Sequence, residues 1–292
     1  MNVKVIFLVA FCGIYAQAES QLTDPFIPDP GVPQEITGMD LVWHDEFNGD
    51  GKPDVHNWKY ENGFVRNEEL QWYQPQNANC LNGVLVIEGR REKIANANYK
   101  KDSKDWRLNR NHAEYTSSSI KTQNLKEWMF GRFLIRARID TSAGSWPAIW
   151  TLGTTGPWPS NGEIDIMEFY RVQETPTILA NVAWGTEQQY VAKWDSEKKK
   201  LSNYLKDDPE WCKKFHIWRM DWTRESISLY LDDELINTTL LSETVNPDRV
   251  NPFLRPHYIL LNLAIGSNGG DPSRSKFPIK YEVDYVRVYQ EK

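Results

Sequence analysis

The chain has 292 residues, among them 13 tryptophans, 13 tyrosines and 11 phenylalanines, and its formal net charge is −6. This length suffices for one substantial core, and all-β domains often reach such a size undivided. The negative charge argues against nucleic acid or an anionic membrane as the main partner, whereas the many aromatic residues are compatible with carbohydrate recognition.

The first 18 residues predict a secretory signal peptide. Lys4 supplies a positive charge, Val5 to Tyr15 form an apolar run, and the sequence Ala-Gln-Ala at 16–18 is an A-x-A cleavage site. The apolar run is shorter than the roughly 20 residues that a helix needs to span a bilayer. We therefore expect an exported protein (secreted, periplasmic or at the cell surface) without a membrane span.

Residues 19–40 predict an extended linker, because they show little apolar periodicity and contain Pro25, Pro28, Pro30 and Pro33. The folded domain is then expected over residues 41–292. Its polar, basic segment 91–112 predicts a solvated loop, and residues 193–206 form a second polar, Lys-rich stretch.

Short strand-forming segments recur along the whole domain, and no long helical period interrupts them. In residues 131–139, for example, Phe133 and Ile135 alternate with Arg132 and Arg136, as expected for a strand with one buried face. Similar segments follow at 178–184, 216–222, 227–231, 258–265 and 281–289. The pattern predicts an all-β sandwich or barrel.

Three carboxylates stand in one predicted strand, directly after the turn residues Pro-Ser-Asn-Gly at 159–162. Glu163 and Asp165 share a face because alternate residues of a strand point the same way. Glu168 would point to the opposite face in a regular strand. One extra residue near Ile166 or Met167, a β-bulge, would return it to the face of the other two.

Tryptophans surround this acidic strand in the sequence. Trp146 and Trp150 precede it, and Trp158 lies in the turn just before it. Flat aromatic faces beside clustered carboxylates suit a sugar ring, and a pair of carboxylates is what glycoside hydrolysis requires. The spacing alone fits equally well a half-buried strand with a solvated acidic face.

The segment S-W-P-A-I-W-T-L-G followed by W-P-S-N-G-E-I-D-I-M-E-F resembles the signature of glycoside hydrolase family 16, and the resemblance extends from about Leu41 to Gln290. The form E-x-D-x-x-E resembles the laminarinase, agarase and endo-galactosidase branches. The resemblance implies a concanavalin A-like β-jelly roll whose concave sheet forms an open cleft. It also implies a retaining, endo-acting β-glycosidase.

By the same resemblance, Glu163 is the nucleophile and Glu168 the general acid/base, with Asp165 between them to hold their charge states. The resemblance further implies a set of substrate-binding residues: Trp146, Trp158, Arg66, Asn67, Glu68, Asn181 and Trp184. The segment around Arg66 would bind sugars on the non-reducing side, although a simple charged turn is the alternative. Trp150 is expected to pack in the core.

Two substrate classes stay open. β-1,3-Glucan or mixed β-1,3/1,4-glucan is the first. Many laminarinases carry a His on the strand after the acidic one, where this chain offers Asn181 and Trp184. This departure keeps a second class open, an endo-β-1,4-galactosidase acting on poly-N-acetyllactosamine, mucin-type O-glycans or an algal galactan. A non-catalytic sugar-binding module would tolerate the loss of Glu163 or Glu168, and both are present.

No cofactor is expected for the reaction, and a monomer is expected. The resemblance allows a structural calcium ion at Glu46, Gly83 and Asp284, although a charged strand end without metal is the alternative. Once the signal is removed, Cys80 and Cys212 remain, either paired or as two buried thiols.

Overall fold

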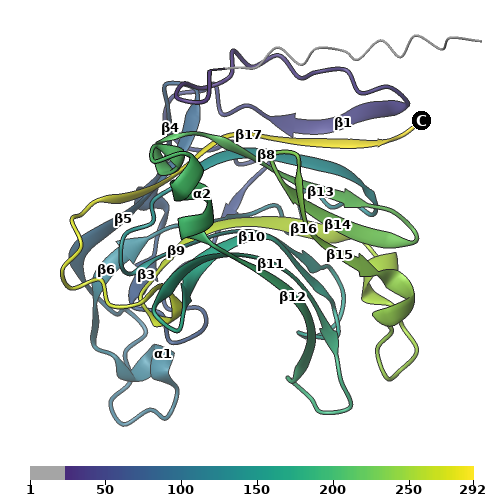
Figure 1. The fold of residues 1–292 in the computed structure, drawn as a ribbon. Helices are drawn as coiled ribbons and strands as arrows, with labels where there is room; N and C mark the ends of the chain where they lie inside the picture. Colours follow the sequence, from purple (N-terminus) through teal and green to yellow (C-terminus); the bar gives the residue numbers. More distant parts are fainter. Residues whose placement is uncertain (1–23) are drawn as a thin grey trace, which may run out of the picture.

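The computed structural model describes residues 24–292 as two β-sheets packed face to face into a curved sandwich (Figure 1). The first sheet has the strand order β15 (Glu234–Leu240), β14 (Ser226–Leu231), β13 (His216–Trp222), β8 (Gly131–Ile139), β17 (Ile279–Glu291), β5 (Val84–Ala95), β6 (His112–Ser117) and β3 (Gln71–Tyr73). Two further strands join it, β1 (Met39–Asp45) beside β17 and β4 (Ala78–Leu81) beside β5.

The second sheet is the concave one and lines the inside of the arch in Figure 1. Its order is β12 (Ala192–Lys200), β11 (Thr175–Gly185), β10 (Glu163–Val172), β9 (Ser145–Gly153), β16 (His257–Ile265), β7 (Ser119–Lys121) and β2 (Lys59–Tyr60). The helical pieces are short: α1 (Trp106–Asn109), α2 (Leu201–Asp207), η1 (Pro75–Asn77), η2 (Trp211–Lys213), η3 (Leu241–Glu243), η4 (Pro252–Leu254) and η5 (Ser267–Gly269). The predicted all-β jelly-roll sandwich is therefore confirmed.

The core lies between the two sheets and is built by alternation. In β13 the even-numbered residues Trp218, Met220 and Trp222 are buried, while their neighbours are partly exposed. From the facing sheet, Phe169 enters the same core. Each fully buried large apolar side chain stabilises the fold by roughly 1.5–3 kcal/mol. The concave sheet is thus fixed from behind, and its inner face is left for function.

Two polar segments are more ordered than their composition predicts. Residues 192–200 form β12, the edge strand of the concave sheet, where lysines are common because they discourage pairing with another chain. The expected loop 91–112 is shorter, since β5 continues to Ala95 and the side chain of Asp105 caps α1 by accepting a hydrogen bond from the backbone N–H of Arg107.

The predicted signal peptide lies outside the described residues, as does the start of the predicted linker. The rest of that linker is not a free tether. Arg136 donates hydrogen bonds to the carbonyls of Asp24 and Ile27, at 2.9 and 3.0 Å, and the N–H of Phe215 donates to the carbonyl of Pro25. The segment is extended, but its backbone carbonyls bind it to the outside of the sandwich.

Cys80 is buried and Cys212 is half-buried, and both are free thiols. Of the two alternatives that the sequence left open, the structure therefore has the unpaired one. Within residues 24–292, no helix is long and apolar enough to cross a membrane.

Candidate active site

A β-bulge in β10 places the three carboxylates on one face. Asp165 pairs with Asn181 on β11 and Glu168 pairs with Leu179, so three steps along β10 match only two along β11. The additional residue is accommodated because Ile166 and Met167, although consecutive, are both buried in the core. The predicted bulge is confirmed, and Glu168 faces the concave side together with Glu163 and Asp165.

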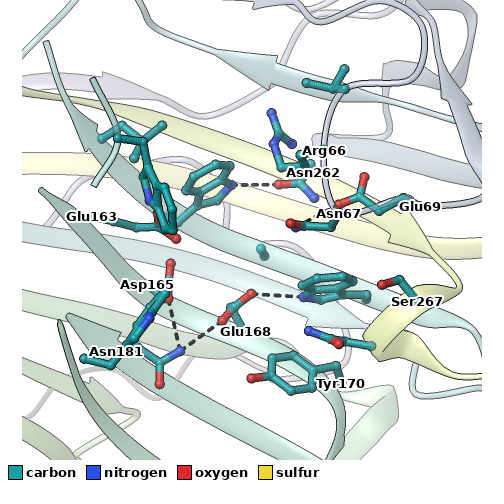
Figure 2. Close-up of a pocket in the computed structure, with 18 of the residues that line it drawn as sticks. Arg66, Asn67, Glu69, Glu163, Asp165, Glu168, Tyr170, Asn181, Asn262 and Ser267 are labelled. Carbon is teal, nitrogen blue, oxygen red and sulfur yellow. Dashed lines mark hydrogen bonds between the residues drawn. The ribbon is translucent and has the colours of Figure 1, made fainter. Parts of the chain in front are cut away.

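The carboxylates lie in a cleft of about 1150 Å³, on the inner face of the concave sheet (Figure 2). Such a volume exceeds that of most pockets for a single small ligand and leaves room for several sugar units. Its walls combine indole rings with polar groups. The lining residues include Arg66, Asn67, Glu69, Trp146, Trp150, Trp158, Tyr170, Asn181, Trp194, Ser196, Lys198 and Asn262.

Each outer carboxylate accepts a hydrogen bond from a tryptophan. The indole N–H of Trp158 donates to Glu163, and that of Trp146 donates to Oε1 of Glu168 at 3.0 Å. Figure 2 shows the second of these contacts beside the ring of Tyr170. The two predicted cleft tryptophans therefore lie at the site, where they orient the carboxylates and offer apolar surface.

Asn181 links the carboxylates of Asp165 and Glu168. Its Nδ2 donates to Oδ2 of Asp165 and to Oε2 of Glu168, both at 3.0 Å. Its Oδ1 accepts a hydrogen bond of 2.5 Å from the hydroxyl of Ser196 on β12. Since ionised carboxylates only accept, the amino end of the amide faces them, and Ser196 holds the other end by donating to its oxygen. Asn181, predicted to bind substrate, thus contacts the acidic residues directly.

The surroundings shift the three carboxyl groups upward by different amounts. Burial raises the pKa of Glu163, and the hydrogen bonds from Trp158 and Asp165, with the positive charge of Arg66, oppose that rise. Burial and then the charge of Glu163 raise the pKa of Glu168 to about 7. Burial and both neighbouring charges raise the pKa of Asp165 well above its usual range. The charge of Glu163 thus raises the pKa of both neighbours, while the positive charge of Arg66 favours the ionised form of Glu163 itself.

One side of the cleft is formed by Arg66 and aromatic rings. Its guanidinium forms an ion pair with Glu61 and lies 5.0 Å from the ring centroid of Trp150. The indole N–H of Trp150 donates to Oδ1 of Asn262 at 2.7 Å. Trp150 was expected to pack in the core; it packs in a small buried apolar cluster with Ala148, Tyr258 and Leu260, on the cleft face of the sheet. It stands directly opposite Asp165 on β9, and paired residues of a sheet share a face.

Two predicted substrate-binding residues lie elsewhere. Trp184 packs in the core, because it is three positions from Asn181 on β11 and strand alternation puts the two on opposite faces. Glu68 is exposed outside the cleft, because Asn67 and Glu68 both adopt positive φ and turn the chain. Glu69, which is 2% exposed, takes the place in the cleft that was predicted for Glu68.

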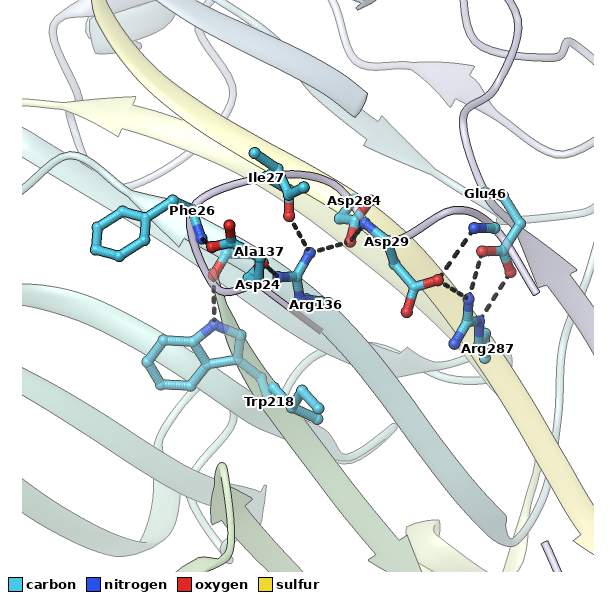
Figure 3. A network of polar contacts seen from close by, with 12 residues as sticks. Asp24, Phe26, Ile27, Asp29, Glu46, Arg136, Ala137, Trp218, Asp284 and Arg287 are labelled. Atoms are coloured by element: carbon cyan, nitrogen blue, oxygen red, sulfur yellow. Dashed lines mark hydrogen bonds and ion pairs between the residues drawn. The ribbon is translucent and has the colours of Figure 1, made fainter. Parts of the chain in front are cut away.

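The two acidic residues predicted to hold calcium form ion pairs with arginines (Figure 3). Glu46 accepts hydrogen bonds of 2.9 and 2.7 Å from Arg287, and Asp284 forms an ion pair with Arg136. Gly83 has φ of 77°, which the turn before β5 requires. Among residues 24–292 no three or more His, Cys, Asp or Glu side chains gather as a metal group would need. Both acidic side chains are thus paired with arginines, and calcium binding there stays a prediction.

Several site residues carried no recognisable signal in the sequence. Ser196, Trp194 and Lys198 belong to a segment that reads as a polar stretch, and Asn262 belongs to an apolar run. An alternation count over 192–200 would have put Trp194, Ser196 and Lys198 on one face, but nothing in the sequence says that this strand pairs with β11.

Deletion of Met167 is expected to leave a folded enzyme with measurable activity and a lower melting temperature. The strand then becomes regular, Glu168 stays on the face of Glu163 and Asp165, and the loss of one buried side chain costs roughly 2–5 kcal/mol. Deletion of Ile164 is the matched control, because it removes an equally buried residue but puts Glu163 and Asp165 on opposite faces. Equal activity in the two deletion variants would contradict the bulge assignment.

Ser196→Ala is expected to lower kcat by about tenfold, because the Asn181 amide then loses the hydrogen bond that holds its donating end against the carboxylates. The hydrogen bond from Asn181 lowers the pKa of Glu168, so its loss should move the alkaline limb of the pH–rate profile upward. Ser196→Thr keeps the hydroxyl and should restore both. An unchanged pH profile with a raised KM would mean that Ser196 contacts substrate instead.

A concave sheet that carries clustered carboxylates with raised pKa values, in a cleft lined by indole rings, defines a class of enzyme that cleaves glycans. The sequence matches the family "Glycosyl hydrolases family 16" over residues 88–287. A β-glucanase of Rhodothermus marinus is 34% identical over a match of 269 positions, and the match covers 86% of this chain and 85% of that protein.

Solved structures of glycan-cleaving enzymes also match this chain. One, from work on endo-acting O-glycanases that members of the human gut microbiota express to initiate mucin breakdown, is 36% identical with a TM-score of 0.79, over 91% of this chain and 94% of the other. A non-specific endo-β-1,3(4)-glucanase is 33% identical with a TM-score of 0.71, over 91% and 97% of the two chains. The chain therefore belongs to glycoside hydrolase family 16, and it is a glycoside hydrolase.

Proposed function

We propose that the protein is a retaining, endo-acting β-glycosidase in which Glu163 is the nucleophile and Glu168 the general acid/base. The different surroundings of the two glutamates on one face of the cleft carry this proposal. Below about pH 7, Glu168 holds a proton that it can give away, while the positive charge of Arg66 favours the ionised form of Glu163. Asp165, between them and hydrogen-bonded by Asn181, keeps these charge states apart.

The reaction then proceeds in two displacements. A carboxylate oxygen of Glu163 attacks the anomeric carbon, the glycosidic C–O bond breaks, and Glu168 gives its proton to the leaving oxygen. In the second step Glu168 takes a proton from water, the water oxygen attacks the same carbon, and the ester to Glu163 breaks. Water is the only co-reactant, and no cofactor takes part.

For the substrate, we propose β-1,3-glucan or mixed β-1,3/1,4-glucan. The support is the named activity of the β-glucanase relative and of the solved endo-β-1,3(4)-glucanase, together with an open cleft long enough for an internal stretch of chain. A β-galactose-containing chain is the second candidate. It is favoured by Asn181 at the position where many laminarinases carry His, and by the likeness to an O-glycanase.

A panel of laminarin, barley glucan, agarose and mucin O-glycans, with the products sized, tests both candidates. Oligosaccharides of intermediate length, released early from one polymer, would identify the substrate and endo action. Glu163→Gln, purified in the same way, controls for contaminating hydrolases. If the wild type cleaved none of the four, or released only monosaccharides, the proposal would be wrong.

The first product released is expected to have the β configuration, because two successive inversions at one carbon give net retention. Proton NMR of the anomeric signal in the first minutes, before mutarotation, measures this. An initial α product would mean direct attack by water and a wider carboxylate gap, and would overturn the role of Glu163.

We also propose that residues 1–18 direct export and that the mature enzyme is a monomer. Lys4, the apolar run from Val5 to Tyr15 and the A-x-A motif at 16–18 support export, and the net charge of −6 supports a monomer. Mass spectrometry of the mature protein should find Glu19 at the N-terminus, and light scattering should find one chain per particle. An active protein that still carries residues 1–18 would contradict the proposed export signal. A stable dimer would contradict the proposed monomer.

A further inference from the structure

The edge strand β12 presents three side chains to the cleft. Alternation along the strand places Trp194, Ser196 and Lys198 on the inner face, and all three line the cleft. Trp194 is 45% exposed although it is a large aromatic residue. The inner face of β12 therefore combines an indole surface, a hydroxyl and an ammonium group, beyond the carboxylates of β10.

Sheet pairing fixes where this face lies relative to the carboxylates. Trp194 pairs with Ala183, which pairs with Glu163; Lys198 pairs with Leu179, which pairs with Glu168. Two strand spacings of about 4.8 Å put β12 roughly 10 Å from β10. A glycan that crosses β10 between the two glutamates would next cross β12 between Trp194 and Lys198.

The lysines of β12 differ in their partners. Lys199, on the opposite face, forms an ion pair of 3.2 Å with Glu234, and the ammonium of Lys193 lies 5.1 Å from the ring centroid of Trp184. Lys198 forms no ion pair with any residue in the described part of the chain. Lys200 lies two positions further along β12 and therefore adds a second positive charge on the same face as Lys198. The β12 side of the cleft therefore has a cation available for a ligand.

We propose that Trp194 and Lys198 form a subsite for the sugar beyond the cleaved bond, and that this subsite takes a sugar with an anionic substituent, a sulfate ester or a carboxylate. The indole would pack against the C–H face of the ring, and the ammonium would pair with the anion. This inference rests on the proposed function, which places bond cleavage at β10. Arg66 lies on the β9 side of the carboxylates, so Trp194 and Lys198 would contact the glycan on the opposite side of β10.

The test measures binding, so that turnover does not enter. Inactive Glu163→Gln protein is titrated with laminaritetraose and with di-N-acetyllactosamine, each in neutral, mono-sulfated and carboxylated form. The substitution Lys198→Gln is then introduced into this protein. Lys199→Gln is the matched control, because Lys199 is a neighbouring lysine of the same strand that faces away from the cleft. Thermal melts of each variant verify that the fold is intact.

In the series that binds, we expect an anionic form to bind about fivefold more tightly than the neutral one, the size of a favourable exposed ion pair. The preference should disappear in Lys198→Gln, persist in Lys199→Gln, and shrink as salt rises from about 0.05 to 0.5 M. The sulfated and carboxylated arms show which anion is preferred. Trp194→Ala should weaken neutral and anionic forms alike, by about three- to tenfold.

Equal or weaker binding of both anionic forms, or a preference that survives Lys198→Gln, would overturn the subsite. The proposed function is judged separately, by cleavage of neutral polymer by the wild type. An enzyme that cleaves neutral chains but shows no anionic preference would retain the proposed function and lose only the subsite. A protein that binds neither series would overturn the subsite, and the cleavage panel would still decide the proposed function.

Discussion

Glu163→Gln and Glu168→Gln are each expected to lower kcat by at least about a thousandfold while oligosaccharide binding and the fold are retained. The amide keeps the volume of the side chain but can neither attack the anomeric carbon nor transfer a proton. The lost interactions therefore belong to the transition state, and the loss should appear in kcat rather than in KM. Steady-state kinetics on the polymer identified by the panel, with titration of the inactive variants, measures both quantities.

Chemical rescue distinguishes the two roles. In Glu163→Ala, added azide occupies the nucleophile's place and attacks once, so the product should be an α-glycosyl azide. In Glu168→Ala, the glycosyl-enzyme ester still forms on substrates with a good leaving group, and azide should release a β-glycosyl azide. The same azide anomer from both variants, or near-normal turnover in either Gln variant, would refute the assignment.

Activity is expected to fall about tenfold per pH unit above an apparent pKa near 7. Glu168 must be protonated for the first step, and burial together with the charge of Glu163 raises its pKa to about 7. The profile of kcat/KM reports this group in the free enzyme. Because the three carboxyls interact, the limb belongs to the group as a whole, and Asp165→Ala should shift it upward by removing a hydrogen bond that favours the ionised form of Glu168. An alkaline limb near pH 5 would contradict the prediction.

The same raised pKa affects stability. The folded state holds the proton of Glu168 more tightly than the unfolded state, so its stabilising contribution is complete below about pH 4.5 and is lost as the pH rises through 7. At pH 8 the buried charge should cost on the order of 3 kcal/mol. Glu168→Gln should therefore melt several degrees higher than the wild type at pH 8, and the difference should vanish at pH 4. A lower melting temperature at pH 8 would show that the carboxylate is well solvated.

The sequence by itself determined the fold class and the acidic strand. Strand alternation is a local rule with a period of two, so the pattern of residues 131–139 was enough to predict β8. The spacing E-x-D-x-x-E is one residue too long for a regular strand, and only a bulge reconciles it with a common face. These conclusions depend on neighbours in the chain, which is why they could be drawn without coordinates.

Only the tertiary structure decided which side chains meet the carboxylates. Asn181 and Ser196 come together because β12 pairs with β11 in one particular register, and Trp150 faces the cleft because it stands opposite Asp165. Register depends on which strands become neighbours and on which face is buried, and both are set by contacts between residues far apart in sequence. A one-residue shift of β12 would turn Trp194 and Lys198 away from the cleft, so the inner face of this edge strand could not be read from composition.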